Sequence, residues 1–153
     1  MKLNSDFSEL LSAFSSARVR YLVVGGLAVV EYTEPRYTKD LDVFIEATEA
    51  NAKRVFAVLK RFGAPLDGIS AADFANPKLV YQMGVEPVRV DILMSLKGVK
   101  FTEAWKSRTV VKWGRTSVNL ISLDHLIANK SSVGRPQDQL DVARLRAVRS
   151  RGR

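Results

Sequence analysis

Hydrophobic positions in the first part of the chain follow two different periods. Over residues 7–14, apolar side chains recur every three to four positions, which predicts an amphipathic helix. The short apolar run 21–24 predicts a strand, and Gly25 and Gly26 directly after it predict a turn into a second helix that includes 27–30. The chain is therefore expected to open with a helix, a strand, a glycine turn and another helix.

The remaining segments continue to alternate between the two patterns. Strands are predicted over 41–45, 79–83, 88–94, 109–113 and 116–121. Further helices are predicted to begin after the capping residues Thr48 and Ser122, and at Pro136. Glycine-containing turns join the second of these strands to the third and the fourth to the fifth, which indicates two hairpins. This order predicts an α/β or α+β protein in which helices flank a mixed β-sheet.

Composition narrows the class of protein. With 153 residues the chain suits a single domain, which we expect over 1–148, followed by a basic end over 149–153 that frays. The absence of cysteine excludes disulfide frameworks and thiolate zinc sites. No apolar run is long enough to cross a membrane and the N-terminus shows no signal-peptide pattern, so we expect an unexported, cytoplasmic protein.

The formal net charge of +8 favours an anionic partner. Lys and Arg attract phosphates through a long-range, salt-sensitive field, which makes nucleotides or nucleic acid the expected partners. A basic protein that binds no nucleic acid is the alternative, because net charge alone does not define a site. The arginine-rich C-terminal end is open to the same two interpretations, a tRNA-binding tail or a solvated terminus.

Three carboxylates stand in or beside predicted strands. Because side chains alternate across a strand, Asp40 and Asp42 are expected to share one face of the strand at 41–45. Asp91 interrupts an otherwise apolar strand, and it joins the pair if the two strands are neighbours, at about 4.8 Å. Carboxylate oxygens suit Mg²⁺ or Mn²⁺, and two such ions can steady the attacking and leaving oxygens in phosphoryl transfer. The alternative is a solvated strand end.

The glycine pair offers a second half of such a site. Without side chains, Gly25 and Gly26 allow a triphosphate to approach the backbone, and amides at the start of the next helix favour anions. A glycine pair after a strand more often marks only a turn. Its position ahead of Asp40 and Asp42 makes the functional interpretation more specific.

This order resembles the polymerase-beta type of nucleotidyltransferase superfamily, whose first motif is an apolar residue, two small residues, a helix and Asp-x-Asp. Val24 supplies the apolar residue ahead of the glycines, and Asp91 matches the family's third carboxylate. Within the superfamily, residues 25–28 and 36–42 look most like the AbiEii-type proteins, the nucleotidyltransferase toxins of toxin–antitoxin systems. Lys130, with the charged residues after it, is similar to a downstream motif of that group.

The resemblance implies a nucleotidyltransferase fold and an enzyme that moves a nucleoside monophosphate from an NTP to an acceptor hydroxyl with Mg²⁺ or Mn²⁺. It implies that the three aspartates bind the metal ions, that Asp91 helps to activate the attacking hydroxyl, and that Lys130 contacts the triphosphate. Arg36 and Lys39 precede the acidic pair; they either neutralise phosphate charge or form ion pairs at the surface.

The acceptor is left open among three hypotheses. The first is RNA, and tRNA in particular, modified by a toxin that has a cognate antitoxin. The second is a hydroxyl of a protein or of a small molecule such as an aminoglycoside. The third is a degenerate fold that only binds a nucleotide or a partner, because toxins of this type usually have a longer C-terminal region. A homodimer that completes the acceptor site is compatible with all three.

Overall fold

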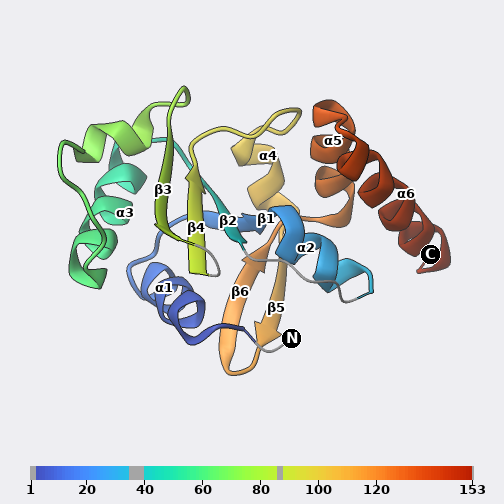
Figure 1. Ribbon diagram of the computed structural model, residues 1–153, viewed down its shortest axis with the longest axis horizontal. Helices are drawn as coiled ribbons and strands as arrows, with labels where there is room; N and C mark the ends of the chain where they lie inside the picture. Colours follow the sequence, from blue (N-terminus) through green and yellow to red (C-terminus); the bar gives the residue numbers. More distant parts are fainter. Residues whose placement is uncertain (1–2, 35–39, 86–87, 153) are drawn as a thin grey trace.

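The computed structural model describes residues 3–34, 40–85 and 88–152. The elements are, in chain order, α1 (Ser5–Ser16), β1 (Tyr21–Val24), α2 (Gly25–Tyr32), β2 (Asp40–Ile45), α3 (Glu49–Phe62), the short 3-10 helix η1 (Ala71–Ala75), β3 (Val80–Val85), β4 (Val88–Leu93), α4 (Phe101–Lys106), β5 (Thr109–Trp113), β6 (Thr116–Leu120), α5 (Leu123–Val133) and α6 (Pro136–Arg151). Figure 1 shows the strands at the centre with helices around them. This confirms the predicted succession of elements, except for α4, whose six residues are too few to produce a helical repeat.

All six strands of the described chain belong to one mixed sheet in the order β3-β4-β2-β1-β6-β5. The two predicted hairpins, β3–β4 and β5–β6, are antiparallel and form the two ends of the sheet. In the middle, β2 runs parallel to β4 and antiparallel to β1, and β1 runs parallel to β6. The mixed α/β fold is as the sequence predicts, and it places β2 directly beside β4.

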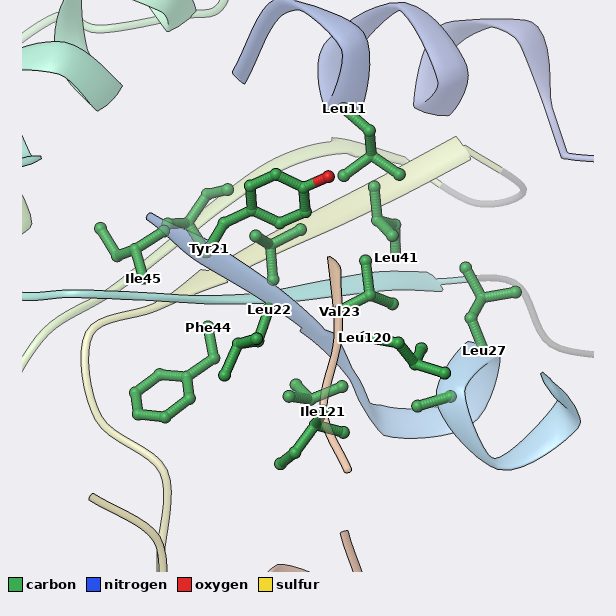
Figure 2. Close-up of a cluster of buried hydrophobic side chains, with 14 of the residues drawn as sticks. Leu11, Tyr21, Leu22, Val23, Leu27, Leu41, Phe44, Ile45, Leu120 and Ile121 are labelled. Carbon is green, nitrogen blue, oxygen red and sulfur yellow. The ribbon is translucent and has the colours of Figure 1, made fainter. Parts of the chain in front are cut away.

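The hydrophobic core lies on both faces of the central strands. Figure 2 shows Leu11 of α1 packed over Tyr21 and Leu41, on the side of the sheet opposite Leu22 and Phe44. All four residues of β1 are buried, as expected for a central strand covered on both faces. The exception is one face of β2 and β4, where charged side chains alternate along each strand with core residues such as Leu41 and Val90 on the other face.

Local capping explains where several helices start and stop. The Thr48 side chain accepts a hydrogen bond from the Asn51 amide at the start of α3, and Gly63 ends that helix in the left-handed conformation. Ser122 caps α5 by accepting from the His125 amide. These are the capping residues that the sequence indicates for the two helices.

The C-terminal helix α6 includes part of the basic end of the chain, because it continues to Arg151. Near its end, Arg149 forms an ion pair with Asp124 of α5 at 3.3 Å. No helix in the described ranges is both long and apolar enough to span a bilayer.

Candidate active site

The register between β2 and β4 brings the predicted acidic residues to one place. Asp42 pairs with Asp91, and Asp40 pairs with Arg89, in the parallel ladder between the two strands. Paired residues of neighbouring parallel strands project to the same face of the sheet. Three carboxylates and one guanidinium therefore occupy two adjacent rows of the same sheet face, as the alternation of side chains along each strand predicts for the carboxylates.

The glycine turn lies against the second of these carboxylates. Val24, the last residue of β1, pairs with Asp42 across the antiparallel ladder. Gly25 follows with φ +67°, and a Cβ atom at this position would overlap Oδ2 of Asp42. Gly25 is therefore required both for its backbone conformation and for the space that the carboxylate occupies. Gly26 lies in the first turn of α2, the helix that starts at this point.

Asp42 is in an unfavourable environment for a negative charge. Burial, followed by the charges of Asp91 and Asp40, raises the pKa of Asp42 to about 6. The positive charges of Lys130 and Arg89 act in the opposite direction but do not cancel this effect. A cation placed between the carboxylates would offset both the cost of burying the charge of Asp42 and the repulsion among the carboxylates.

Asp40 has an oxygen without a partner. Its Oδ1 atom is buried and accepts no hydrogen bond from any residue that the structure describes. A buried carboxylate oxygen without a donor is costly unless an ion or water satisfies it. Together with the raised pKa of Asp42, this oxygen makes the site chemically suited to a hard divalent cation.

Asp91 is held by an arginine on its own strand. The Nε atom of Arg89 donates to Oδ1 of Asp91 at 3.1 Å, and Nη2 donates to Oδ2 at 3.3 Å. This hydrogen bond and the charge of Asp91 raise the pKa of Arg89. As the side chains stand, no three acidic or histidine side chains within the described ranges form a group that could hold a metal ion. The metal site therefore remains a prediction from the chemistry of its donors.

A second charged cluster lies where α5 packs against α6. Lys130 of α5 is almost fully buried, and its Nζ atom lies 3.1 Å from Asp138 Oδ1 and 3.3 Å from Asp141 Oδ2. Its charge also acts on Asp42, so this cluster is electrically coupled to the carboxylates on the sheet. The predicted contact between Lys130 and a triphosphate stays a prediction, because the ammonium group already has two partners.

Arg135 joins the same cluster from the solvent side. It donates through Nε to Asp138 Oδ2 at 2.7 Å, while 71% of its side chain remains exposed. The hydrogen bond from Arg135 lowers the pKa of Asp138 to about 2, against the effect of burial. Asp138 is therefore ionised at neutral pH and links an exposed arginine to a buried lysine.

A comparison with protein families covers nearly the whole chain. Residues 3–153 match the family described as nucleotidyl transferase of unknown function, DUF2204. The chain belongs to this family. The site at β2 and β4 therefore lies in a nucleotidyl transferase, which agrees with the enzyme class that the sequence motif predicts. No curated protein matches the chain.

Solved structures of nucleotidyltransferases share the fold of this nucleotidyl transferase. The lincosamide antibiotic adenylyltransferase LnuA, solved with lincomycin bound, superposes with a TM-score of 0.61 at 15% identity and covers 96% of this chain and 98% of its own. The antibiotic-resistance factor ANT(2'')-Ia gives a TM-score of 0.57 at 14% identity, covering 92% of this chain and 80% of its own. A putative nucleotidyltransferase from Thermotoga maritima gives 0.55 at 13% identity, covering 94% of this chain and 86% of its own. At these identities the similarity shows the fold alone.

In the structure, the predicted carboxylates of this nucleotidyl transferase and the nearby Lys130 have charged partners that the sequence motif does not include. Arg89 lies two residues before Asp91, so alternation along the strand predicts that both are on the same face, and the structure adds the ion pair between them. Asp141 could not be predicted in this way, because its burial against Lys130 depends on how α5 and α6 pack. The predicted phosphate contacts Arg36 and Lys39 lie outside the described residues.

Proposed function

We propose that this nucleotidyl transferase moves a nucleoside monophosphate from an NTP to an acceptor hydroxyl, with Mg²⁺ or Mn²⁺ as cofactor. The observation that carries the proposal is the pairing of Asp42 with Asp91, directly beside the turn at Gly25. Carboxylates and exposed backbone amides at one end of a sheet provide separate partners for metal ions and for phosphate oxygens.

The cofactor would be held by Asp40, Asp42 and Asp91. Asp40 offers the buried Oδ1 atom that lacks a donor, and Asp42 offers a carboxylate whose charge needs compensation. When bound, divalent ions polarise the phosphate oxygens and neutralise the charge that develops on the leaving group.

The chain's own residues position the reactants. The first turn of α2, from Gly25, directs amide groups toward the triphosphate, and Lys130 supplies positive charge from the adjacent helix. The acceptor oxygen forms a bond to the α-phosphorus, the bond between this phosphorus and the bridging oxygen breaks, and pyrophosphate leaves. A carboxylate oxygen of Asp91 takes the proton of the acceptor hydroxyl. Catalysis is then positioning and charge stabilisation, without a protein nucleophile.

RNA is the first acceptor that we propose, and tRNA in particular. The net charge of +8 supports an anionic acceptor. The resemblance of the first motif to AbiEii-type proteins supports the role of a growth-inhibiting toxin with a cognate antitoxin.

A small-molecule hydroxyl is the second acceptor, supported by a specific observation. The chain corresponds almost end to end to an enzyme named as a lincosamide adenylyltransferase. The second acceptor that we propose is therefore a small molecule of the kind for which that enzyme is named.

The proposal is tested by following the label of each α-labelled NTP in the presence of Mg²⁺. The acceptors are total tRNA, a protein extract, and a panel of hydroxyl-bearing antibiotics that includes lincosamides and aminoglycosides. Label that appears in one acceptor with the native chain and is lost with Asp42→Asn, in a protein that remains folded, supports nucleotidyl transfer and identifies the acceptor. Equal labelling by Asp42→Asn, or nucleotide binding without transfer to any acceptor, argues against the proposed chemistry.

A further inference from the structure

Arg89 is the one positive charge in the paired rows of β2 and β4 that carry the three aspartates. It lies opposite Asp40 in the ladder, next to the row in which Asp42 faces Asp91. Its guanidinium forms a two-point contact with Asp91, and the charges of Asp40 and Asp42 also act on it. The guanidinium therefore provides the positive charge that the acidic cluster needs when no other cation is present.

The two-point contact determines what Asp91 can bind. Each carboxylate oxygen of Asp91 accepts one hydrogen bond from Arg89, and Gln82 of β3 adds a longer contact to Oδ2 at 3.5 Å. A guanidinium in this geometry uses one lone pair of each carboxylate oxygen, and a metal ion held by both oxygens would need the same two lone pairs. Among residues 3–34, 40–85 and 88–152, the arginine fork on these three carboxylates is the one between Arg89 and Asp91, so the competition there concerns the third carboxylate.

The arginine can leave without disrupting the fold. About a third of its side chain, 34%, is exposed, against 14% for Asp91. It lies near one end of β4 and on the sheet face away from the core residues Val90 and Ile92. A partly exposed ion pair is also weak compared with a buried one, so its rupture requires little free energy.

We infer that Arg89 is a built-in counter-ion of Asp91 that a divalent cation has to displace before the third carboxylate can bind it. This rests on the proposed function only in that Asp40, Asp42 and Asp91 bind a metal. In the metal-free protein the guanidinium holds Asp91 in place and reduces repulsion among the carboxylates. When a cation binds, the arginine turns outward, where its charge is available to a phosphate of the incoming nucleotide.

The test is Mn²⁺ binding to the metal-free protein without nucleotide, measured from the free-ion signal in electron paramagnetic resonance. We expect Arg89→Gln to tighten Mn²⁺ binding by about three- to tenfold, since the loss of a competing exposed ion pair is of that order. The matched control is Arg135→Gln, which removes another arginine that interacts with Asp42 but is held by Asp138. We expect it to change Mn²⁺ affinity by less than about twofold, because charges that are not in contact are screened.

The outcomes separate this inference from the proposed function. Equal tightening by both arginine variants would show a general effect of charge and would overturn the displacement of Arg89. Unchanged or weaker binding in folded Arg89→Gln would also overturn it, while loss of binding in Asp42→Asn would still support the metal site. Mn²⁺ binding in none of the proteins would overturn both proposals. Circular dichroism of each variant establishes that the fold is retained.

Discussion

The ionisation of Asp42 affects both the stability of the folded chain and the proposed binding of a metal ion. Its pKa of about 6 in the folded chain lies above the ordinary value of 3.8. Between these two values the folded state holds a proton that the unfolded state has released, so stability falls as pH rises through this window. Above it, the ionised side chain destabilises the metal-free protein by up to about 3 kcal/mol.

We therefore expect Asp42→Asn to be more stable than the native chain at pH 7.5 and about equal to it at pH 4. The measurement is urea unfolding in the presence of a chelator at both pH values. Asp67→Asn, a change at an exposed loop carboxylate, should alter stability by less than about 0.5 kcal/mol and serves as the control. A native chain that is the more stable one at pH 7.5 would contradict the electrostatic account of Asp42.

Gly25 and Gly114 allow the backbone requirement to be separated from the requirement for space. Both have a left-handed conformation, with φ +67° and +64°, but only at Gly25 would a Cβ atom meet a side chain, that of Asp42. We expect the substitution of either glycine by alanine to lower the free energy of unfolding by about 1–2 kcal/mol through backbone strain. Gly25→Ala should in addition weaken Mn²⁺ binding, because the carboxylate has to turn away. Calorimetric unfolding and Mn²⁺ titration of the two variants test this, and equal Mn²⁺ affinities would exclude the steric role.

At the scale of elements, the pairing of α5 with α6 depends on a buried charge. Lys130 lies between Asp138 and Asp141, whose side chains are 1% and 0% exposed. We expect Lys130→Met to lower the free energy of unfolding by about 3–5 kcal/mol, because two buried carboxylates then lose the ammonium group that pairs with them.

The same two helices supply the control for Lys130→Met. Arg149 of α6 pairs with Asp124 of α5 at the surface, where both side chains are exposed. Arg149→Met should cost less than about 1 kcal/mol, since exposed pairs contribute little. Chemical denaturation of both variants gives the comparison; losses of similar size would show that burial of the Lys130 network does not matter to the packing of α5 on α6.

At the scale of the whole molecule, the net charge of +8 predicts how salt affects the affinity for the acceptor. If RNA is the acceptor, its apparent affinity at saturating NTP should fall by about tenfold or more between 50 and 200 mM salt, because phosphate contacts release counter-ions. An uncharged small-molecule acceptor should show almost no change. The initial rate of label transfer as a function of acceptor concentration at the two salt levels distinguishes them, and a salt-independent affinity for tRNA would argue against RNA.

Most of the element order is determined locally, and for that reason it could be predicted. Strands and helices follow from side-chain periodicity, and their ends follow from residues such as Thr48, Gly63 and Ser122. The α4 helix was missed because six residues contain no repeat, and its position depends on packing such as the contact between Phe101 and Phe44. The carboxylate positions were predicted because alternation along a strand is a local property too.

The sequence by itself thus determined the glycine turn, the three carboxylates and the helix caps, because each depends on residues a few positions apart. Only the tertiary structure decided that β2 lies beside β4, so that Asp42 faces Asp91, and that the Asp42 carboxylate fills the space that a Cβ atom at residue 25 would need. It also decided that the ammonium group of Lys130 pairs with Asp141 as well as with Asp138. These contacts join segments that are distant along the chain, and their formation depends on how the sheet and helices bury apolar surface together.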